Sequence, residues 1–198
     1  MWRAAARLLA LALAAALLAG CASVGPVVKI GLVAPFEGRD RAVGYDAIYA
    51  ARLAVREVNA RGGIDGTRVA LVALDDRGDP ALATQTAAAL VVDPGVVAVV
   101  GHYLPATTAA AADIYAKAEM PLLIAGAPPF AAADPAALPP DFVAAYEAVT
   151  PFDETPGPYA GPTYDAFGLL WAALAQAKES GGELSRASVQ QALRGLEY

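Results

Sequence analysis

The sequence is poor in the residues that most often hold metals or form covalent bonds. Its 198 residues include one cysteine, Cys21, and one histidine, His102. A single cysteine excludes an intrachain disulfide, and a lone histidine is a weak basis for a zinc site. No GxSxG, P-loop or GxGxxG motif occurs in the chain. We therefore expect a protein that is not an enzyme and that uses neither a metal nor a cofactor.

Charged residues are also scarce, at 17% of the chain against 57% hydrophobic residues. Acidic side chains outnumber basic ones, and the formal net charge is −6. Phosphate binding needs a basic surface, so this balance disfavours a nucleic-acid partner.

The N-terminus has the pattern of a bacterial export signal. Two arginines precede the apolar run at residues 8–18, which is shorter than the roughly 20 residues that span a membrane. The string that follows, Leu18-Ala19-Gly20-Cys21, resembles a lipobox, in which the signal is cut before a cysteine that is then lipidated.

This pattern predicts a lipoprotein signal peptide over residues 1–20 and a tether over residues 21–26. We expect the protein to be exported and anchored to the membrane through lipidated Cys21, facing the periplasm or the cell exterior. An ordinary secretory signal with a chance cysteine, or an uncleaved anchor, are the alternatives.

Residues 27–124 alternate apolar, β-branched runs with segments of helical periodicity. Strands are expected over residues 27–34, 68–74, 96–100 and 121–124, and helices over residues 47–60, 81–92 and 107–118. The strands are apolar throughout, which is typical of a parallel sheet that is covered on both faces. The sequence therefore predicts an α/β fold with a doubly wound, mostly parallel sheet in three αβα layers.

The chain changes character at residues 125–140, which read AGAPPFAAADPAALPP and include five prolines. Beyond this Pro/Ala-rich segment only helices are expected, over residues 141–148, 163–178 and 185–194. An aromatic and apolar face on the second of these helices predicts that it packs against a core. We expect residues 27–198 to form a single domain.

Several strings in residues 28–124 resemble periplasmic binding proteins of the leucine/isoleucine/valine-binding type, which serve branched-chain amino-acid ABC importers. The most specific is LAVREVNARGGIDG at residues 53–66. The family pattern is continued by Gly38 with Gly44, Asp75-Asp76 with Asp79-Pro80, and residues 112–115.

Residues 141–146, 158–160, 164–166 and 187–193 resemble a later block of the same family. In full-length relatives a long segment, holding most of a second lobe, separates the two blocks. Here the Pro/Ala-rich segment stands in its place. The resemblance therefore implies a type I periplasmic-binding-protein lobe that has lost most of the second lobe.

The loops that leave the carboxyl ends of the strands form the ligand crevice in such sheets. The resemblance implies that a small amino-acid-like solute binds there, with its carboxylate at a helix N-terminus. The candidate ligand-binding residues are Tyr45, Tyr103, Pro105, Ala106, Thr107, Thr108, Gly126 and Ala127. An equal alternative for the two threonines is that they only cap the helix.

Several donors that the resemblance leads us to expect are missing. Pro105 stands where relatives commonly carry a serine, and it has neither a hydroxyl nor an N–H. Residues 125–128 lack hydroxyls, and Val43 replaces a frequent aromatic. Loss of a lobe also removes roughly half of the contacts with a solute. We therefore expect millimolar affinity or none for a free amino acid.

The implied partners are a small solute and an ABC permease or a second copy of the chain. The alternative functions are a one-lobed protein-interaction module and a decayed paralogue that traps no solute.

Other polar residues have less specific patterns. His102 is expected to be structural, at the edge of the crevice. Asp75, Asp76 and Asp79 could hold Ca²⁺ or Mg²⁺, but their spacing lacks the longer pattern of an EF-hand and better fits capping and solvation of a loop. A phosphoacceptor receiver domain also pairs aspartates in this way, but Gly101-His102 stands where it would need another aspartate.

Overall fold

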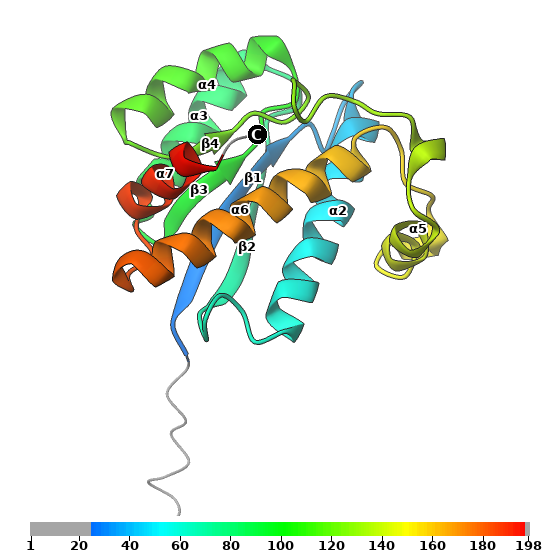
Figure 1. Cartoon of the computed structure of the whole chain (residues 1–198). Helices are drawn as coiled ribbons and strands as arrows, with labels where there is room; N and C mark the ends of the chain where they lie inside the picture. The colour runs from blue at the N-terminus through cyan, green and yellow to red at the C-terminus, as the bar shows by residue number, and fades with distance from the viewer. Residues whose placement is uncertain (1–24, 197–198) are drawn as a thin grey trace, which may run out of the picture.

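The computed structural model describes residues 25–196 (Figure 1). The expected signal peptide and Cys21 lie outside the described residues. A four-stranded sheet forms the centre, with strands in the order β2-β1-β3-β4 and every neighbouring pair parallel. The strands are β1 (Val27–Ala34), β2 (Arg68–Asp75), β3 (Val96–Val100) and β4 (Leu122–Leu123). The four expected strands are confirmed, although β4 is shorter than the sequence predicts.

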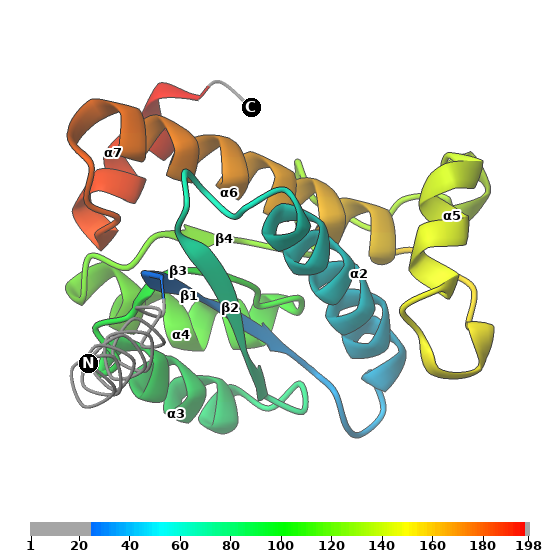
Figure 2. The same ribbon diagram turned by 90° about the horizontal axis from the view of Figure 1, so that it is seen from below.

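Helices cover both faces of this sheet (Figure 2). One face carries α2 (Arg41–Ala60), α6 (Ala160–Gly181) and α7 (Arg186–Gly195). The other carries α3 (Pro80–Val91) and α4 (Pro105–Lys117). The three-layer, doubly wound α/β architecture expected from the sequence is therefore confirmed.

The core has two parts because the strands bury side chains on both sides. Ile30 and Leu32 of β1 belong to the cluster under α2, α6 and α7, whereas Val33 belongs to the cluster under α3 and α4. All three side chains are fully buried. Burial on both faces explains why the strand sequences are apolar throughout rather than alternating.

The two helices after β1 and β2 begin in different ways. The side chain of Asp79 caps α3, accepting hydrogen bonds from Ala81 N at 2.6 Å and Leu82 N at 3.3 Å, and Pro80 is the first helical residue. Helix α2 begins at Arg41, earlier than the predicted residue 47. The prediction starts late because the first turn of the helix lacks an apolar repeat. Gly44 lies in that turn, where a Cβ would stand 2.3 Å from the carbonyl oxygen of Pro35.

The Pro/Ala-rich segment, residues 125–140, is held against the rest of the fold. Gly126 N donates to the carbonyl oxygen of Phe130 at 3.0 Å, and Ala133 N donates to that of Pro158 at 2.9 Å. The Phe130 side chain is buried in the larger core cluster. Figure 1 shows this segment passing over the beginning of α6 before it reaches α5 (Pro140–Glu147).

A third apolar cluster attaches α5 to α2 and α6, with Tyr146 fully buried against Leu53. Asp46 of α2 fastens the loop before α6, because its carboxylate accepts hydrogen bonds from Gly157 N at 3.1 Å and Tyr159 N at 3.0 Å. Burial raises the pKa of this carboxyl above its ordinary value, against the lowering effect of the two backbone donors. No helix within residues 25–196 is long and apolar enough to cross a membrane.

Candidate functional site

The loops at the carboxyl edge of the sheet pack closely on one another. A Cβ on Gly126, after β4, would stand 2.3 Å from the carbonyl oxygen of Tyr103, after β3. A Cβ on Gly78, after β2, would stand 3.0 Å from the side chain of Leu104 and 3.3 Å from that of Asp40. These contacts bring the loops after all four strands together, where a doubly wound sheet carries its ligand crevice.

Helix α4 opens onto this edge with an N-terminus that no side chain caps. Its N-cap residue is Leu104, and Pro105 is the first helical residue. The first helical backbone bond runs from Thr108 N to the carbonyl oxygen of Leu104, at 3.0 Å. The N–H groups of Ala106 and Thr107 therefore have no acceptor within the helix, and they are aligned with the positive end of the helix dipole. Only Ala106 is exposed, because Thr107 is fully buried.

The hydroxyls of the two threonines do not cap the helix. Thr107 Oγ1 donates to the carbonyl oxygen of Leu104 at 3.0 Å, and Thr108 Oγ1 lies 3.0 Å from that oxygen and 3.1 Å from the carbonyl oxygen of His102. The alternative that these threonines cap α4 is wrong, because their hydroxyls bond to carbonyls before the helix rather than to its N–H groups. Whether they contact a ligand stays a prediction.

The other candidate residues divide between the crevice loops and α2. The ring of Tyr103 is buried and stacks edge-on against Tyr159, and its hydroxyl shares a 2.8 Å hydrogen bond with Thr163. Burial raises the pKa of the Tyr103 hydroxyl. Gly126 lies against the Tyr103 backbone, with Ala127 next in the chain. Tyr45 lies apart from them in sequence, near the start of α2, with an exposed side chain.

A buried set of three hydrogen-bonded side chains beneath the crevice was not expected from the sequence. His102 Nδ1 lies 2.7 Å from Asp76 Oδ2, and His102 Nε2 lies 3.2 Å from the hydroxyl of Tyr115. All three side chains are buried. The expectation that His102 lies at the crevice edge is wrong, because its ring points inward between the β2–α3 loop and α4. Its expected structural role is confirmed.

The side chains of Asp75, Asp76 and Asp79 all accept hydrogen bonds from backbone N–H groups. Asp75 Oδ1 accepts from Phe36 N at 2.8 Å and from Arg77 N at 2.9 Å, and Asp76 Oδ1 accepts from Gly78 N at 2.9 Å. These bonds confirm the capping interpretation. The expected solvation does not hold for Asp76, which is fully buried. In the described part of the chain, no cluster of three or more His, Cys, Asp or Glu side chains could hold a metal ion.

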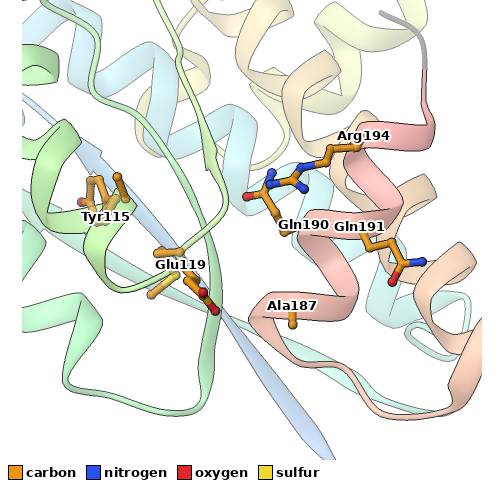
Figure 3. Close-up of a pocket in the computed structure, with 8 residues that line it drawn as sticks. Tyr115, Glu119, Ala187, Gln190, Gln191 and Arg194 are labelled. Atoms are coloured by element: carbon orange, nitrogen blue, oxygen red, sulfur yellow. The ribbon is translucent and has the colours of Figure 1, made fainter.

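A groove of about 690 Å³ lies between the C-terminal end of α4 and α7 (Figure 3). Gln190 and Arg194 of α7 face across it towards Glu119. This groove borders the C-terminal end of α4, whereas the uncapped N–H groups lie at the N-terminal end of that helix. It is therefore separate from the crevice at the carboxyl edge.

Two curated proteins that this chain resembles are named as amino-acid-binding proteins. The amino acid binding protein of Pseudomonas aeruginosa is 35% identical over 91 residues, covering 46% of this chain and 24% of the relative. The Leu/Ile/Val-binding protein of Escherichia coli is 35% identical over 107 residues, covering 50% of this chain and 29% of the relative. The chain thus spans about a quarter of the length of these relatives.

Solved structures extend the likeness beyond the first block. The branched-chain amino acid transporter substrate binding protein LivJ from Streptococcus pneumoniae, in complex with isoleucine, superposes with a TM-score of 0.68 at 17% identity, covering 84% of this chain and 87% of that one. The leucine binding protein LivK from Thermotoga maritima gives 0.66 at 15% identity, covering 85% and 87%. At these identities the likeness establishes the fold, which is that of a type I periplasmic-binding-protein lobe.

The family itself is established by sequence. The model of the family described as periplasmic binding protein matches residues 27–140, which is more than half of the chain. This match covers β1 to β4 and every loop of the crevice, and it continues through the Pro/Ala-rich segment. The chain therefore belongs to the periplasmic binding protein family.

Proposed function

We propose that the protein is an exported, lipid-anchored solute-binding protein of the kind that serves ABC importers, and that it binds a small amino-acid-like solute. The observation that carries the proposal is the uncapped N-terminus of α4, where Ala106 is exposed and its N–H group has no acceptor within the helix. The names of the relatives, Leu/Ile/Val-binding protein among them, support a branched-chain amino acid as the solute.

The geometry supports a definite mode of binding. The solute carboxylate accepts a hydrogen bond from the N–H group of the exposed residue Ala106, where the helix dipole favours negative charge. Gly126 and Ala127 bring backbone, without bulky side chains, to the same loops. The mature chain would then present the bound solute to a membrane permease, with Cys21 as the lipid anchor.

A second candidate function is supported by the hydroxyl groups. The hydroxyls of Tyr103, Thr107 and Thr108 are all engaged by protein atoms. A solute ammonium needs acceptors rather than N–H donors, and the hydroxyl oxygens that could accept from it belong to buried or half-buried residues. We therefore expect affinity of about 1 mM or weaker. This favours the alternative of a one-lobed interaction module, or a decayed paralogue, that traps no solute.

Thermal melting separates the two candidates. A soluble form, with residues 1–20 removed and Cys21 replaced by serine, is melted with leucine, isoleucine and valine at concentrations up to about 10 mM. A ligand that binds only the folded state raises the melting temperature. An unchanged melting temperature for every amino acid would reject the solute-binding proposal for those compounds.

A matched pair of variants locates the site. Ala106→Pro removes one N–H donor at a position in the first turn that tolerates proline, whereas Ala106→Ser keeps the donor. We expect the shift produced by leucine to be lost in Ala106→Pro and kept in Ala106→Ser. Equal shifts in both variants would place the ligand elsewhere.

A further inference from the structure

A second groove, of about 440 Å³, lies between the Pro/Ala-rich segment, α5 and the first turns of α6. Its apolar lining includes Pro129 and Leu138 of that segment, Phe142 of α5, and Pro162 and Tyr164 of α6. None of its lining residues belongs to the proposed solute site. Figure 1 shows the Pro/Ala-rich segment running past the beginning of α6 to α5, and the groove is lined by residues of these three parts of the chain.

The walls of this groove are held in place by packing. Leu138 lies directly over Gly161, where a Cβ would stand 2.6 Å from Leu138 Cδ2. The rings of Phe142 and Tyr164 meet edge to face, with centroids 5.1 Å apart. The Tyr164 hydroxyl donates to the carboxylate of Glu57 on α2. These contacts fix the aromatic wall before any ligand arrives, so little ordering is needed on binding.

The charges at the groove all have one sign. Asp134 and Asp165 are the only charged residues among those that line it. Asp134 Oδ1 accepts a hydrogen bond from Ala136 N at 3.0 Å. Asp165 is an exposed residue and makes no hydrogen bond or ion pair with any of residues 25–196. Partial desolvation still raises the pKa of its carboxyl. An uncompensated carboxylate therefore lies next to Tyr164 in the chain and lines the same groove as Phe142.

We propose that this groove binds a small organic cation with an apolar body, of the arylalkylammonium class. The apolar body packs between Leu138 and the Phe142–Tyr164 wall, and the ammonium group pairs with the Asp165 carboxylate. The aromatic faces add attraction for the cation. An apolar cleft with one oriented charged group is the usual form of a small-molecule site. This site is independent of the crevice at the carboxyl edge.

Binding is tested with three probes that share a phenyl ring and differ in charge: 2-phenylethylammonium, 2-phenylethanol and 3-phenylpropionate. Dissociation constants come from two-dimensional NMR titrations of the soluble form, residues 21–198 with Cys21 replaced by serine. We expect the cation to bind most tightly, with shifts confined to residues 129–142 and 161–165. No binding of the cation at 20 mM, or equal binding of the carboxylate, would overturn the proposal.

A matched pair of acidic variants tests the role of Asp165. Asp165→Asn should weaken the cation about fivefold, as expected for a partly exposed ion pair, and should leave 2-phenylethanol unchanged. Asp141→Asn removes an exposed carboxylate of α5 that does not line the groove, and it should leave both probes unchanged. Equal weakening of the cation in the two variants, or no weakening in Asp165→Asn, would contradict direct pairing.

Discussion

The carboxylate of Asp76 lies 2.7 Å from the imidazole Nδ1 of His102, and both side chains are fully buried. Tyr115 completes the arrangement from the other side of the ring, with its hydroxyl 3.2 Å from Nε2. The ring thereby joins the β2–α3 loop to the last turn of α4. Since His102 directly follows Gly101 at the end of β3, this contact fixes the direction in which α4 presents its N-terminus to the crevice.

Removing the imidazole should therefore destabilise the fold strongly. His102→Ala leaves the buried carboxylate of Asp76 without its side-chain partner, which costs about 3–5 kcal/mol for a buried charged group. Tyr115→Phe removes only the hydroxyl and should cost about 1 kcal/mol. Urea denaturation of the two variants measures both losses. Similar, small losses would mean that the buried group contributes little to stability.

The second prediction concerns the close approach of the loops after β3 and β4. Gly126 has a φ of +81°, and a Cβ there would stand 2.3 Å from the carbonyl oxygen of Tyr103. Gly62 has a φ of +99° but no atom within 4 Å of the corresponding Cβ. Alanine at Gly62 therefore meets only backbone strain, of about 1 kcal/mol.

Gly126→Ala meets the same strain together with a collision against backbone, so we expect a loss at least twice that of Gly62→Ala. Equilibrium unfolding of the two variants gives the comparison. Equal losses would show that the two loops separate easily, and would weaken the assignment of Gly126 to a rigid crevice wall.

Much of this fold follows from local sequence pattern. The β-branched runs predict β1 and β3 over the same residues that the structure shows, because buried parallel strands need continuous apolar sequence. Asp79-Pro80 predicts the start of α3 because capping depends on adjacent residues. The predicted start of α2 is too late. Glycine is needed at position 44 because of its close contact with Pro35, and such a tertiary contact leaves no periodic pattern in the sequence.

The polar contacts were harder to predict because they join distant parts of the chain. His102 is 26 residues from Asp76 and 13 from Tyr115, and no spacing rule connects these positions. The groove beside α6 was also missed, since a segment rich in proline and alanine has no period that shows which side of it packs. The candidate site loops were predicted because their position follows from the topology of the sheet.

Arg186 is the subject of the third prediction. Its guanidinium donates to the carbonyl oxygens of Val91 at 2.9 Å, Asp93 at 3.0 Å and Val96 at 3.1 Å. It thus satisfies carbonyls at the end of α3 and at the start of β3, while attaching α7 to both. The planar guanidinium can make these hydrogen bonds at the same time, whereas a lysine ammonium cannot.

We expect Arg186→Ala to cost about 2 kcal/mol, as for other hydrogen bonds made by charged groups, and Arg186→Lys to recover little of it. Arg194→Ala, in the last turn of the same helix, serves as the control and should change stability only slightly. Chemical denaturation measures all three. Full recovery by lysine would mean that charge alone, and not the arrangement of donors, holds α7.

The last prediction concerns the pH dependence that Asp165 adds to stability. Its pKa is raised by partial burial in the folded protein, so the folded state binds a proton more tightly than the unfolded state does. Linkage then requires that this carboxyl lower stability as pH rises from its unfolded pKa through its folded pKa, and that the penalty stay constant above that window.

Asp165→Asn should therefore melt higher than the wild type at pH 7, with a difference that shrinks as pH falls towards 4. Asp141 is exposed, as Asp165 is, but it does not line the groove, so Asp141→Asn is the control for the general loss of one negative charge. A difference that is independent of pH, or that is the same in both variants, would show that the Asp165 carboxylate is not held in an unfavourable environment and has no need of a bound cation.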